Sequence, residues 1–534
     1  MCMLLKRTIF LVLMTGVSLT LGAHASHSEY DQEAIKLRQA VLDGTLSEEY
    51  AVEVWKEDSK TIPAWAQGDS EKVKQYYKAH AEGRLDRMLG YVACRMGVIV
   101  HGDVTQNQLE QNLARFDIQK LLVQGPYGDA VLSLEAQQLV YDSLVDMPKV
   151  YDMHLHNLGY DEGNYLNPKS AALGIATWMD YFTFMVLRYA AGMTSPEGST
   201  QEARRRLQLY AAHFPKLEGI VLPIHQAFTP DGEVDWKNTG SYLANQAALK
   251  TALTFSSDDS ELFPAVSVHP FDPKWQEKLI SARQKGICLV KWMPPQSIPP
   301  DSEAIDRFYI LMRELGMVLI AHAGPEHTIP TDKENEQWVD WGNPLRFRKA
   351  LQMGVNVILA HCGHSDNIPD LDSPERTLIP GYELFLRLAR EAREKNKTGE
   401  WTGKLYGDLA AVTTHYGPDF IRHLLNCSGE SCVRLIYGSD YPFTNLIKPR
   451  KDAYEICAQE GLLDQEKVEP LKEIRNWNPL LANYVFTKNL AYVDETGKTF
   501  AFPLQTFTGE FSDGELVLID RELWNQYQNK EDEK

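Results

Sequence analysis

Basic side chains are outnumbered in this sequence. Lysine and arginine together make up 54 residues against 73 aspartates and glutamates, so the 534-residue chain has a formal net charge of −19. The acidic residues are spread along the chain without long runs. The phosphates of a nucleic acid would repel such a surface, so we expect no nucleic-acid partner. Net charge says little about what substrate a protein takes.

Long apolar runs are also scarce, and the clearest one lies near the start. Thr8–Leu21 follows the positively charged Lys6 and Arg7 and precedes the small-residue pattern Ala23-His24-Ala25. This order of features is typical of a secretory signal peptide. We therefore expect residues 1–25 to be cleaved and the protein to be exported to the periplasm or secreted.

No other stretch is apolar enough to cross a membrane. Ala172–Met193 comes nearest, but Asp180 and Arg188 interrupt it. Charged residues are rare in membrane-spanning helices because they are costly to bury in lipid. After signal cleavage we expect no membrane association.

Cysteine is rare, with seven residues in the chain. A protein of this length with 44% hydrophobic residues can bury a sizeable core and needs no disulfides to fold. Cys427 and Cys432 are close enough in sequence to pair in a loop, and the sequence leaves that pairing open. Cys288 and Cys362 lie in apolar strand-like stretches and are predicted to be buried thiols.

Residues 26–147 are predicted to form a mainly helical region. Apolar residues recur at helical spacing in Glu33–Leu42, Ser70–Glu82, Arg84–Arg95, Thr105–Arg115 and Ser133–Val145. This region shows no catalytic or metal-binding pattern. Its place before a larger domain suggests a role in an interface or at a pocket rim.

From Val150 onward, short buried apolar runs alternate with helical stretches. The expected strands are Val150–Leu155, Leu217–His225, Leu262–His269, Gly286–Met293, Met317–His322, Val355–His361, Lys404–Ala410 and Val433–Asp440. Eight buried strands alternating with helices predict an α/β fold, a (β/α)8 TIM barrel over residues 148–490. A doubly wound sheet is the alternative, but it would not usually gather polar residues at so many strand ends.

The helices between these strands have recognisable ends. Helical spacing marks the stretches Gln276–Lys285, Asp301–Leu315, Pro344–Met353 and Tyr382–Lys395. Gly286, Gly316 and Gly354 follow three of them and are predicted to cap the helix ends. Asn476–Phe486 is expected to be the helix that closes the barrel.

Two segments lie outside the repeating pattern. Tyr160–Phe214 is a long insertion after the first strand, and its aromatic part, Thr177–Met193, is either a helix packed on the barrel or a cover over its mouth. Residues 491–534 form a terminal segment. Thr499–Asp520 is expected to be a hairpin or small sheet, and Gln526–Lys534 a polar tail.

Polar residues stand at the predicted carboxyl ends of the strands. His154 and His156 end the first strand, and residues two apart on a strand point to the same face. Two adjacent imidazoles suit a divalent metal better than a core. Other strand ends carry His225, His269, Lys291, His322, His361 and Asp440. Catalytic groups of TIM barrels come from these ends, so we expect one or two metal ions there.

These motifs resemble the amidohydrolase superfamily, specifically its amidohydrolase family 2 branch. The matching stretches occur in the family's order over roughly residues 148–487, and they are YDMHLH, SVHPFDP, LVKWMPP, LIAHAG, VILAHCGH and LIYGSDYPF. The first 147 residues and the terminal segment lie outside the resemblance.

The resemblance implies a role for each matching residue. The implied metal ligands are His154, His156, His322, His361 and Asp440, and the implied metal is most simply Zn²⁺. His361 would bind a second metal or polarise the substrate and stabilise an oxyanion. Asp440 would handle the proton of metal-activated water and deliver it to the leaving group.

Lys291 decides between sub-classes of the family. In two-metal members a lysine on this strand is carboxylated and bridges the metals. In one-metal members it is an unmodified polar group near the substrate. A purely structural lysine that extends out of the barrel is the third interpretation. His269 is interpreted as structural or as supporting a ligand, and His225 as structural, with contact to the substrate as the alternative.

We therefore expect an exported, metal-dependent hydrolase that cleaves an ester, lactone or amide bond of a small-molecule substrate. A metal-dependent decarboxylase of the same family is the first alternative, because decarboxylases carry similar ligands. A non-catalytic metal-binding protein is the second, although it would be expected to lack a ligand, and none is missing. The oligomeric state stays open, a homo-oligomer included.

Overall fold

The computed structural model describes residues 132–159, 161–166, 199–325, 340–412, 417–429, 433–442, 453–511 and 514–532. All of them belong to one structural unit. The predicted signal peptide, nearly all of the predicted N-terminal helical region and the aromatic stretch Thr177–Met193 lie outside the described residues.

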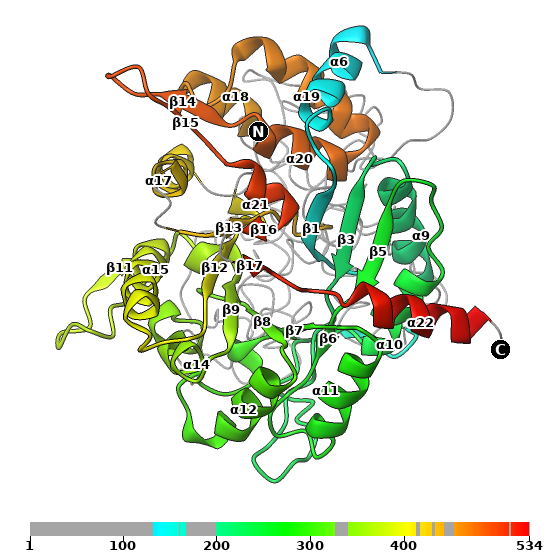
Figure 1. Cartoon of the computed structure of the whole chain (residues 1–534), viewed down its shortest axis with the longest axis vertical. Helices are drawn as coiled ribbons and strands as arrows, with labels where there is room; N and C mark the ends of the chain where they lie inside the picture. The colour runs from blue at the N-terminus through cyan, green and yellow to red at the C-terminus, as the bar shows by residue number, and fades with distance from the viewer. Residues whose placement is uncertain are drawn as a thin grey trace, which may run out of the picture. The chain divides into compact units, whose positions relative to one another are not determined.

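Parallel strands form the centre of this unit (Figure 1). One sheet has the order β1-β3-β5, and a second has the order β13-β12-β9-β8-β7-β6. Their bounds are β1 Val150–Leu155, β3 Leu217–Val221, β5 Glu261–Pro264, β6 Val266–Ser267, β7 Leu289–Trp292, β8 Val318–Ala321, β9 Asn356–Leu359, β12 Leu405–Asp408 and β13 Leu435–Ile436. Only Ala265 separates β5 from β6, so these two strands continue one another.

Backbone hydrogen bonds close the two sheets into a ring. The amide of Met153 in β1 donates to the carbonyl of Tyr437, 3.3 Å away, just after β13. The amide of Asp440 donates to the carbonyl of His154 at 2.9 Å. The last strand therefore pairs with the first, which confirms the predicted (β/α)8 barrel.

The strand sequences explain why they lie at the centre. Every residue of β1, β7, β8 and β12 is buried. Parallel strands covered on both faces have near-continuous apolar sequences rather than alternating ones. The strands are shorter than predicted, and His225, His269, His361 and Asp440 all lie just beyond a strand instead of at its last position.

Helices surround the strands (Figure 1). Their bounds include α9 Ser199–Ala212, α10 Asn245–Leu253, α11 Trp275–Gln284, α12 Asp306–Glu314, α14 Arg348–Gln352, α15 Gly381–Thr398, α17 Pro418–Gly429 and α18 Ala453–Gln459. In α15, Leu384, Leu388 and Ala392 recur at helical spacing and are buried against the barrel. The predicted caps are confirmed, because Gly286, Gly316 and Gly354 have φ values of 84°, 63° and 84°.

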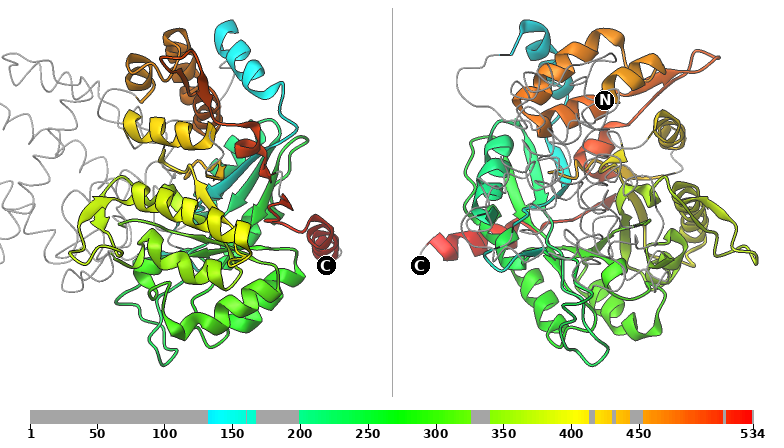
Figure 2. Two further views of the ribbon diagram at one scale, coloured as in Figure 1. Left: turned by 60° about the vertical axis from the view of Figure 1, so that its left-hand side comes forward. Right: turned by 180° about the vertical axis from the view of Figure 1, so that it is seen from behind.

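A helix that precedes the barrel packs beside the helices that follow it. Figure 2 shows α6 (Leu134–Leu144) next to α19 (Val468–Trp477) and α20 (Pro479–Lys488). The hydroxyl of Ser133 donates to Glu473 Oε2 at 2.6 Å, and the hydroxyl of Tyr484 donates to the carbonyl of Ser143 at 2.5 Å. The predicted closing helix begins later than expected, because Asn478 caps α20 and the preceding residues belong to α19.

The residues after the barrel form more helix than predicted. The hairpin of β14 (Ala491–Val493) and β15 (Thr499–Ala501) begins before the predicted range Thr499–Asp520, and a second, shorter antiparallel pair lies inside that range. α21 (Leu504–Thr508) and the strands of this second pair, β16 (Glu510–Phe511) and β17 (Gly514–Glu515), follow the first hairpin. The prediction of a polar tail over Gln526–Lys534 is wrong, because α22 (Arg521–Asp532) is helical. This helix buries Trp524, which is 1% exposed.

We call residues 504–511 and 514–532 the C-terminal strap, because they contact the amino ends of several barrel strands. The amide of Cys288 donates to the carbonyl of Leu518 at 3.1 Å, and the amide of Asp520 donates to the carbonyl of Gly286 at 2.8 Å. Arg521 pairs with Glu218 at 2.5 Å and Glu261 at 2.7 Å. The strap therefore covers the end of the barrel opposite the strand carboxyl ends.

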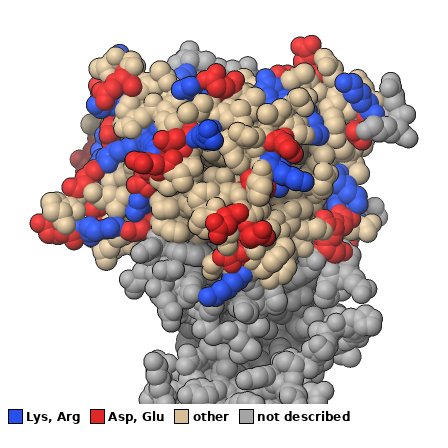
Figure 3. All heavy atoms as spheres, turned by 90° about the horizontal axis from the view of Figure 1, so that it is seen from below, with Lys and Arg blue, Asp and Glu red and all other residues tan. Residues whose placement is uncertain are grey.

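Charge is mixed on the face that Figure 3 shows, where Lys and Arg side chains lie among Asp and Glu side chains. That face carries no basic patch of the kind that nucleic acids need. Among the described helices, none has the length and apolar character required to cross a membrane.

Replacing Gly286 with alanine should weaken the attachment of the strap. The added Cβ would lie 2.4 Å from the carbonyl oxygen of Asp520, and a left-handed φ costs an L-residue about 1–2 kcal/mol. Gly316→Ala is a matched control, because its φ is also positive and nothing lies within 4 Å of its Cβ. We expect a larger fall in the free energy of unfolding for Gly286→Ala, measured by chemical denaturation; equal losses would contradict the contact.

Candidate metal centre

Three histidines at the carboxyl ends of barrel strands have their Nδ1 atoms bound to oxygen. His154 Nδ1 lies 2.5 Å from Asp408 Oδ2. His156 Nδ1 lies 2.9 Å from the carbonyl of Leu222, and His361 Nδ1 lies 2.9 Å from the carbonyl of Ala410. Carboxylates and carbonyls only accept, so each Nδ1 carries the hydrogen. In a neutral ring the Nε2 atom then presents a lone pair.

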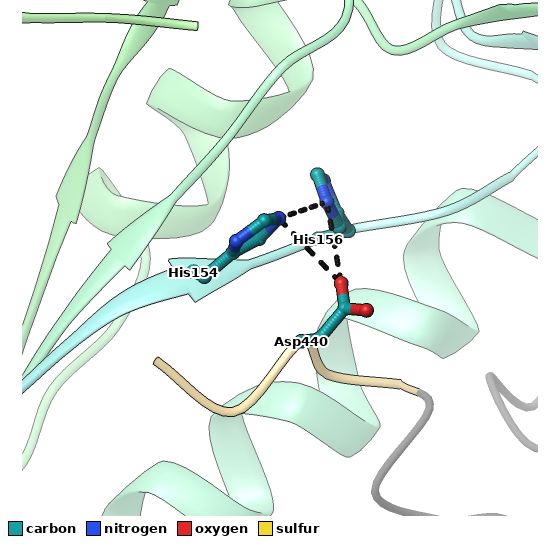
Figure 4. Close-up of side chains that lie close together, drawn as sticks. All are labelled: His154, His156 and Asp440. Atoms are coloured by element: carbon teal, nitrogen blue, oxygen red, sulfur yellow. Dashed lines mark hydrogen bonds and ion pairs between the residues drawn. The ribbon is translucent and has the colours of Figure 1, made fainter. Parts of the chain in front are cut away.

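The Nε2 atoms of His154 and His156 face a common space together with the carboxylate of Asp440 (Figure 4). His154 Nε2 lies 3.1 Å from His156 Nε2. Asp440 Oδ1 lies 3.5 Å from His154 Nε2 and 3.8 Å from His156 Nε2. The ring of His361 has its centroid 5.5 Å from that of His154. Lone pairs and a carboxylate this close repel one another unless they share a cation, and Lys291 Nζ, 3.2 Å from His154 Nε2, already contacts one of them.

Burial keeps these imidazoles neutral. Burial lowers the pKa of His154 and His156 well below the usual value, and the charge of Lys291 lowers both further. Burial, together with nearby His322, lowers the pKa of His361 to about 4. At neutral pH the rings are therefore unprotonated, as metal ligands must be.

The ligand spacing fits a divalent ion. A tetrahedral ion with ligands at about 2.0–2.2 Å separates its ligand atoms by roughly 3.3–3.6 Å. The three separations among His154, His156 and Asp440 bracket this range. Among the described residues, these three buried side chains form the cluster of possible metal ligands whose ligand atoms all lie within 4.8 Å of one another. The donor set therefore suits a metal.

Unusual backbone conformations place several of these groups. His361, Cys362, His364, Ala411 and Asp440 all have positive φ, between 49° and 73°. L-residues rarely adopt this region, and such residues concentrate at functional sites. The prediction from strand alternation therefore holds for His154 and His156, whereas left-handed turns after β9 and β13 aim His361 and Asp440.

Two other predicted site residues border the centre. Lys291 Nζ lies 3.2 Å from His154 Nε2 and is buried, so Lys291 points into the site and does not extend out of the barrel. The ring of His322 lies 5.2 Å from that of His361, and its Nε2 is 3.4 Å from the carbonyl of Pro325. The ligand role of His322 stays a prediction.

His225 and His269 form a separate pair of rings 5.2 Å apart. His225 accepts a hydrogen bond from the amide of Met293 at 3.2 Å and faces the carbonyl of Gln226. His269 accepts from the amide of Phe271 at 2.9 Å and packs against Phe228. Burial lowers their pKa values to about 4 and about 2. These contacts agree with the structural interpretation.

Two buried aspartates near the centre have no counterpart among the predicted site residues. Asp408 ends β12 and contacts His154. Asp152 lies inside β1, where its Oδ1 accepts from the amides of His154 at 3.2 Å and Ser439 at 2.9 Å. Asp408 is the one carboxylate in the predicted seventh strand, Lys404–Ala410, and that was the available signal. Asp152 lies two residues before His154, so strand alternation places it with the two histidines, and that spacing was the available signal.

Sequence comparison bears directly on this geometry. A sequence profile described as amidohydrolase matches residues 151–471, more than half of the chain. The chain belongs to the amidohydrolase family. The matched range begins inside the strand that carries the two adjacent histidines and includes every residue predicted to bind metal. Among curated proteins, none shows significant sequence similarity to this amidohydrolase-family chain.

Several solved structures resemble the chain at low identity. An uncharacterised TIM-barrel protein from Bordetella bronchiseptica is 13% identical, with a TM-score of 0.35, over 63% of this chain and 99% of that one. A probable 2-pyrone-4,6-dicarboxylic acid hydrolase from Acinetobacter baumannii is 15% identical, with a TM-score of 0.32 and the same coverage. A D-hydantoinase from a Bacillus species is 12% identical, with a TM-score of 0.33, over 60% and 69% of the two chains.

Removing the two adjacent histidines should abolish metal binding. We expect the double variant His154→Ala, His156→Ala to retain less than about a tenth of the wild-type metal content, because it loses two of the three clustered ligands. Elemental analysis of purified protein measures this. His423→Ala, on the exposed side of α17, should keep its metal. An unchanged metal content in the double variant would show that the centre lies elsewhere.

Proposed function

We propose that this amidohydrolase-family protein is a metal-dependent hydrolase that cleaves an ester, lactone or amide bond of a small molecule. The observation that carries the proposal is the convergence of the Nε2 lone pairs of His154 and His156 with Asp440 Oδ1 at 3.1–3.8 Å. Zn²⁺ suits imidazole and carboxylate ligands in this arrangement. One ion or two is compatible with the donors.

Asp440 is the group we assign to proton transfer. When bound, a divalent cation supplies the Lewis acidity that brings the pKa of water close to 7. The carboxylate of Asp440 lies beside both histidine Nε2 atoms, so it stands where it can accept a proton from that water. The water oxygen adds to the carbonyl carbon, the bond to the leaving group breaks, and Asp440 returns the proton to the leaving group.

The hydrogen bond between His361 Nδ1 and the carbonyl of Ala410 argues against the oxyanion-stabilising role expected for His361. Stabilising an oxyanion requires a hydrogen on Nε2, but the carbonyl of Ala410 holds the hydrogen on Nδ1. With a pKa lowered to about 4, chiefly by burial, the ring does not gain a second proton at neutral pH. His361 is therefore better suited to bind a metal or to accept a hydrogen bond than to donate one.

Lys291 favours a second candidate, the decarboxylase. Its ammonium group is buried at the centre, 3.2 Å from His154 Nε2. A buried cation there could pair with the carboxylate of an aromatic or similar acid. The same lysine, if carboxylated, could instead bridge two metals in a hydrolase. The modification state of Lys291 thus separates the two reactions.

Metal stoichiometry and mass should decide between these candidates. The test is elemental analysis of protein lacking residues 1–25, with native mass spectrometry for the added CO₂ on Lys291. We expect metal in the purified protein, and two ions per chain with a carboxylated lysine would support hydrolysis. One ion with unmodified Lys291 would favour decarboxylation and direct screens to aromatic carboxylates. No metal after supplementation with zinc or manganese would refute both.

Replacing the strand-end carboxylate should separate chemistry from metal binding. In Asp440→Asn the amide oxygen still coordinates, but the side chain no longer accepts a proton. We expect turnover to fall about 10²–10⁴-fold with metal still bound, since general acid–base catalysis contributes that much. Steady-state kinetics on a hydrolysed substrate, with metal content measured in parallel, provides the readout. Full turnover in a metal-loaded variant would exclude Asp440 from proton transfer.

We also propose that the protein acts outside the cytoplasm after signal cleavage. The support is the sequence pattern of Lys6, Arg7 and the apolar run Thr8–Leu21. Hydrolysis of scavenged nutrients is one role that fits an exported enzyme of this kind.

A further inference from the structure

Asp408 has both of its carboxylate oxygens engaged by N–H groups at the metal centre. Oδ2 lies 2.5 Å from His154 Nδ1, and Oδ1 accepts from the amide of Ala410 at 2.8 Å. The side chain is fully buried at the end of β12. With both oxygens occupied, Asp408 does not face the clustered ligand atoms as a fourth ligand. It contacts the back of one ligand instead.

The surroundings of Asp408 leave it little room to move. A Cβ added at Gly438 would lie 2.5 Å from Asp408 Oδ1 and 2.9 Å from His154 Cβ. Residue 438 therefore has to be glycine for the segment before Asp440 to pass over the Asp408–His154 pair. The ends of the first, seventh and eighth strands meet at this one contact.

We propose that Asp408 is a positioning residue that fixes the tautomer of His154 and thereby aims its Nε2 lone pair at the metal. The inference rests on the proposed metal centre and deepens it. Carboxylates that accept from the outer nitrogen of a ligating histidine orient the ring and raise its basicity, and losing one typically costs 10–100-fold in metal affinity.

The environment of Asp408 makes the Asn variant unusually informative. The amide of Ala410 requires an acceptor, so Asp408→Asn would place its oxygen there and turn its NH₂ group toward His154 Nδ1. In the opposite orientation the NH₂ group of the new side chain would face the amide of Ala410, and two hydrogen-bond donors would be in contact. His154 would then carry its hydrogen on Nε2, which blocks that nitrogen as a ligand.

The decisive experiment ranks two variants by their Zn²⁺ affinity, measured with a competing chelator. Asp408→Asn keeps the shape of the side chain but imposes the wrong tautomer, and Asp408→Ala removes the group and leaves the tautomer free. We expect Asp408→Asn to bind Zn²⁺ at least about tenfold more weakly than wild type, and at least as weakly as Asp408→Ala. A packing role predicts the reverse order, with Asp408→Asn close to wild type.

A second readout follows the tautomer itself. The ¹⁵N shifts of the His154 ring in metal-free protein should report Nδ1–H in wild type, Nε2–H in Asp408→Asn and a mixture in Asp408→Ala. If Asp408→Asn does not fold, the mixture of tautomers expected in Asp408→Ala still tests whether Asp408 fixes the tautomer of His154. Asp152→Asn is the matched control, because it also neutralises a buried aspartate of the centre, but one that bonds to backbone amides and to Ser439, not to an imidazole nitrogen. It should leave the His154 tautomer unchanged.

The outcomes distinguish this inference from the proposed centre. Wild-type protein that binds no Zn²⁺ overturns both. Wild-type protein that binds Zn²⁺, with a folded Asp408→Asn variant of equal affinity and an unchanged ¹⁵N signature, overturns only the role of Asp408.

Discussion

The arrangement of the site depends on where the imidazole hydrogens lie. Each of His154, His156 and His361 gives its Nδ1 hydrogen to an oxygen supplied by a neighbouring strand or the turn that follows it. The Nε2 lone pairs of His154 and His156 are left facing the carboxylate of Asp440. Such a group is costly to bury without a cation. A metal ion bound by His154, His156 and Asp440 would relieve their mutual repulsion, so the hydrogen bonds to the outer Nδ1 atoms prepare the inner Nε2 atoms for metal binding.

The barrel makes this arrangement possible through its strand ends. The central strands are short and apolar, so their termini lie close together at one end. Beyond the strands, His361 and Asp440 take left-handed conformations that their hydrogen-bonded surroundings enforce. At the other end the strap satisfies backbone groups of the fourth strand and pairs Arg521 with acidic residues of the second and third strands. Stability and chemistry thus occupy opposite ends.

Much of the fold is visible in the sequence because buried parallel strands and helix-capping glycines leave local signals. β1 is predicted with its observed bounds, and Gly286, Gly316 and Gly354 have the expected positive φ. The adjacent histidines follow from strand periodicity alone. The contact of Asp408 with His154 and the orientation of His361 do not, because they depend on residues 254 and 49 positions apart in the chain. The helix α22 is not predicted, because its sequence is polar and few of its residues besides Trp524 are buried.

The strap also bears on how the chain reaches its native state during synthesis. Residues 504–532 are made after every strand of the barrel, yet the carbonyl of Leu518 accepts from the amide of Cys288, just before β7, and that of Thr506 accepts from the amide of Tyr437. Until these residues emerge from the ribosome, those backbone groups lack their partners and the apolar strand ends stay uncovered. The barrel therefore cannot complete these contacts until translation has passed the strap, and its uncovered apolar strand ends are exposed to aggregation until then.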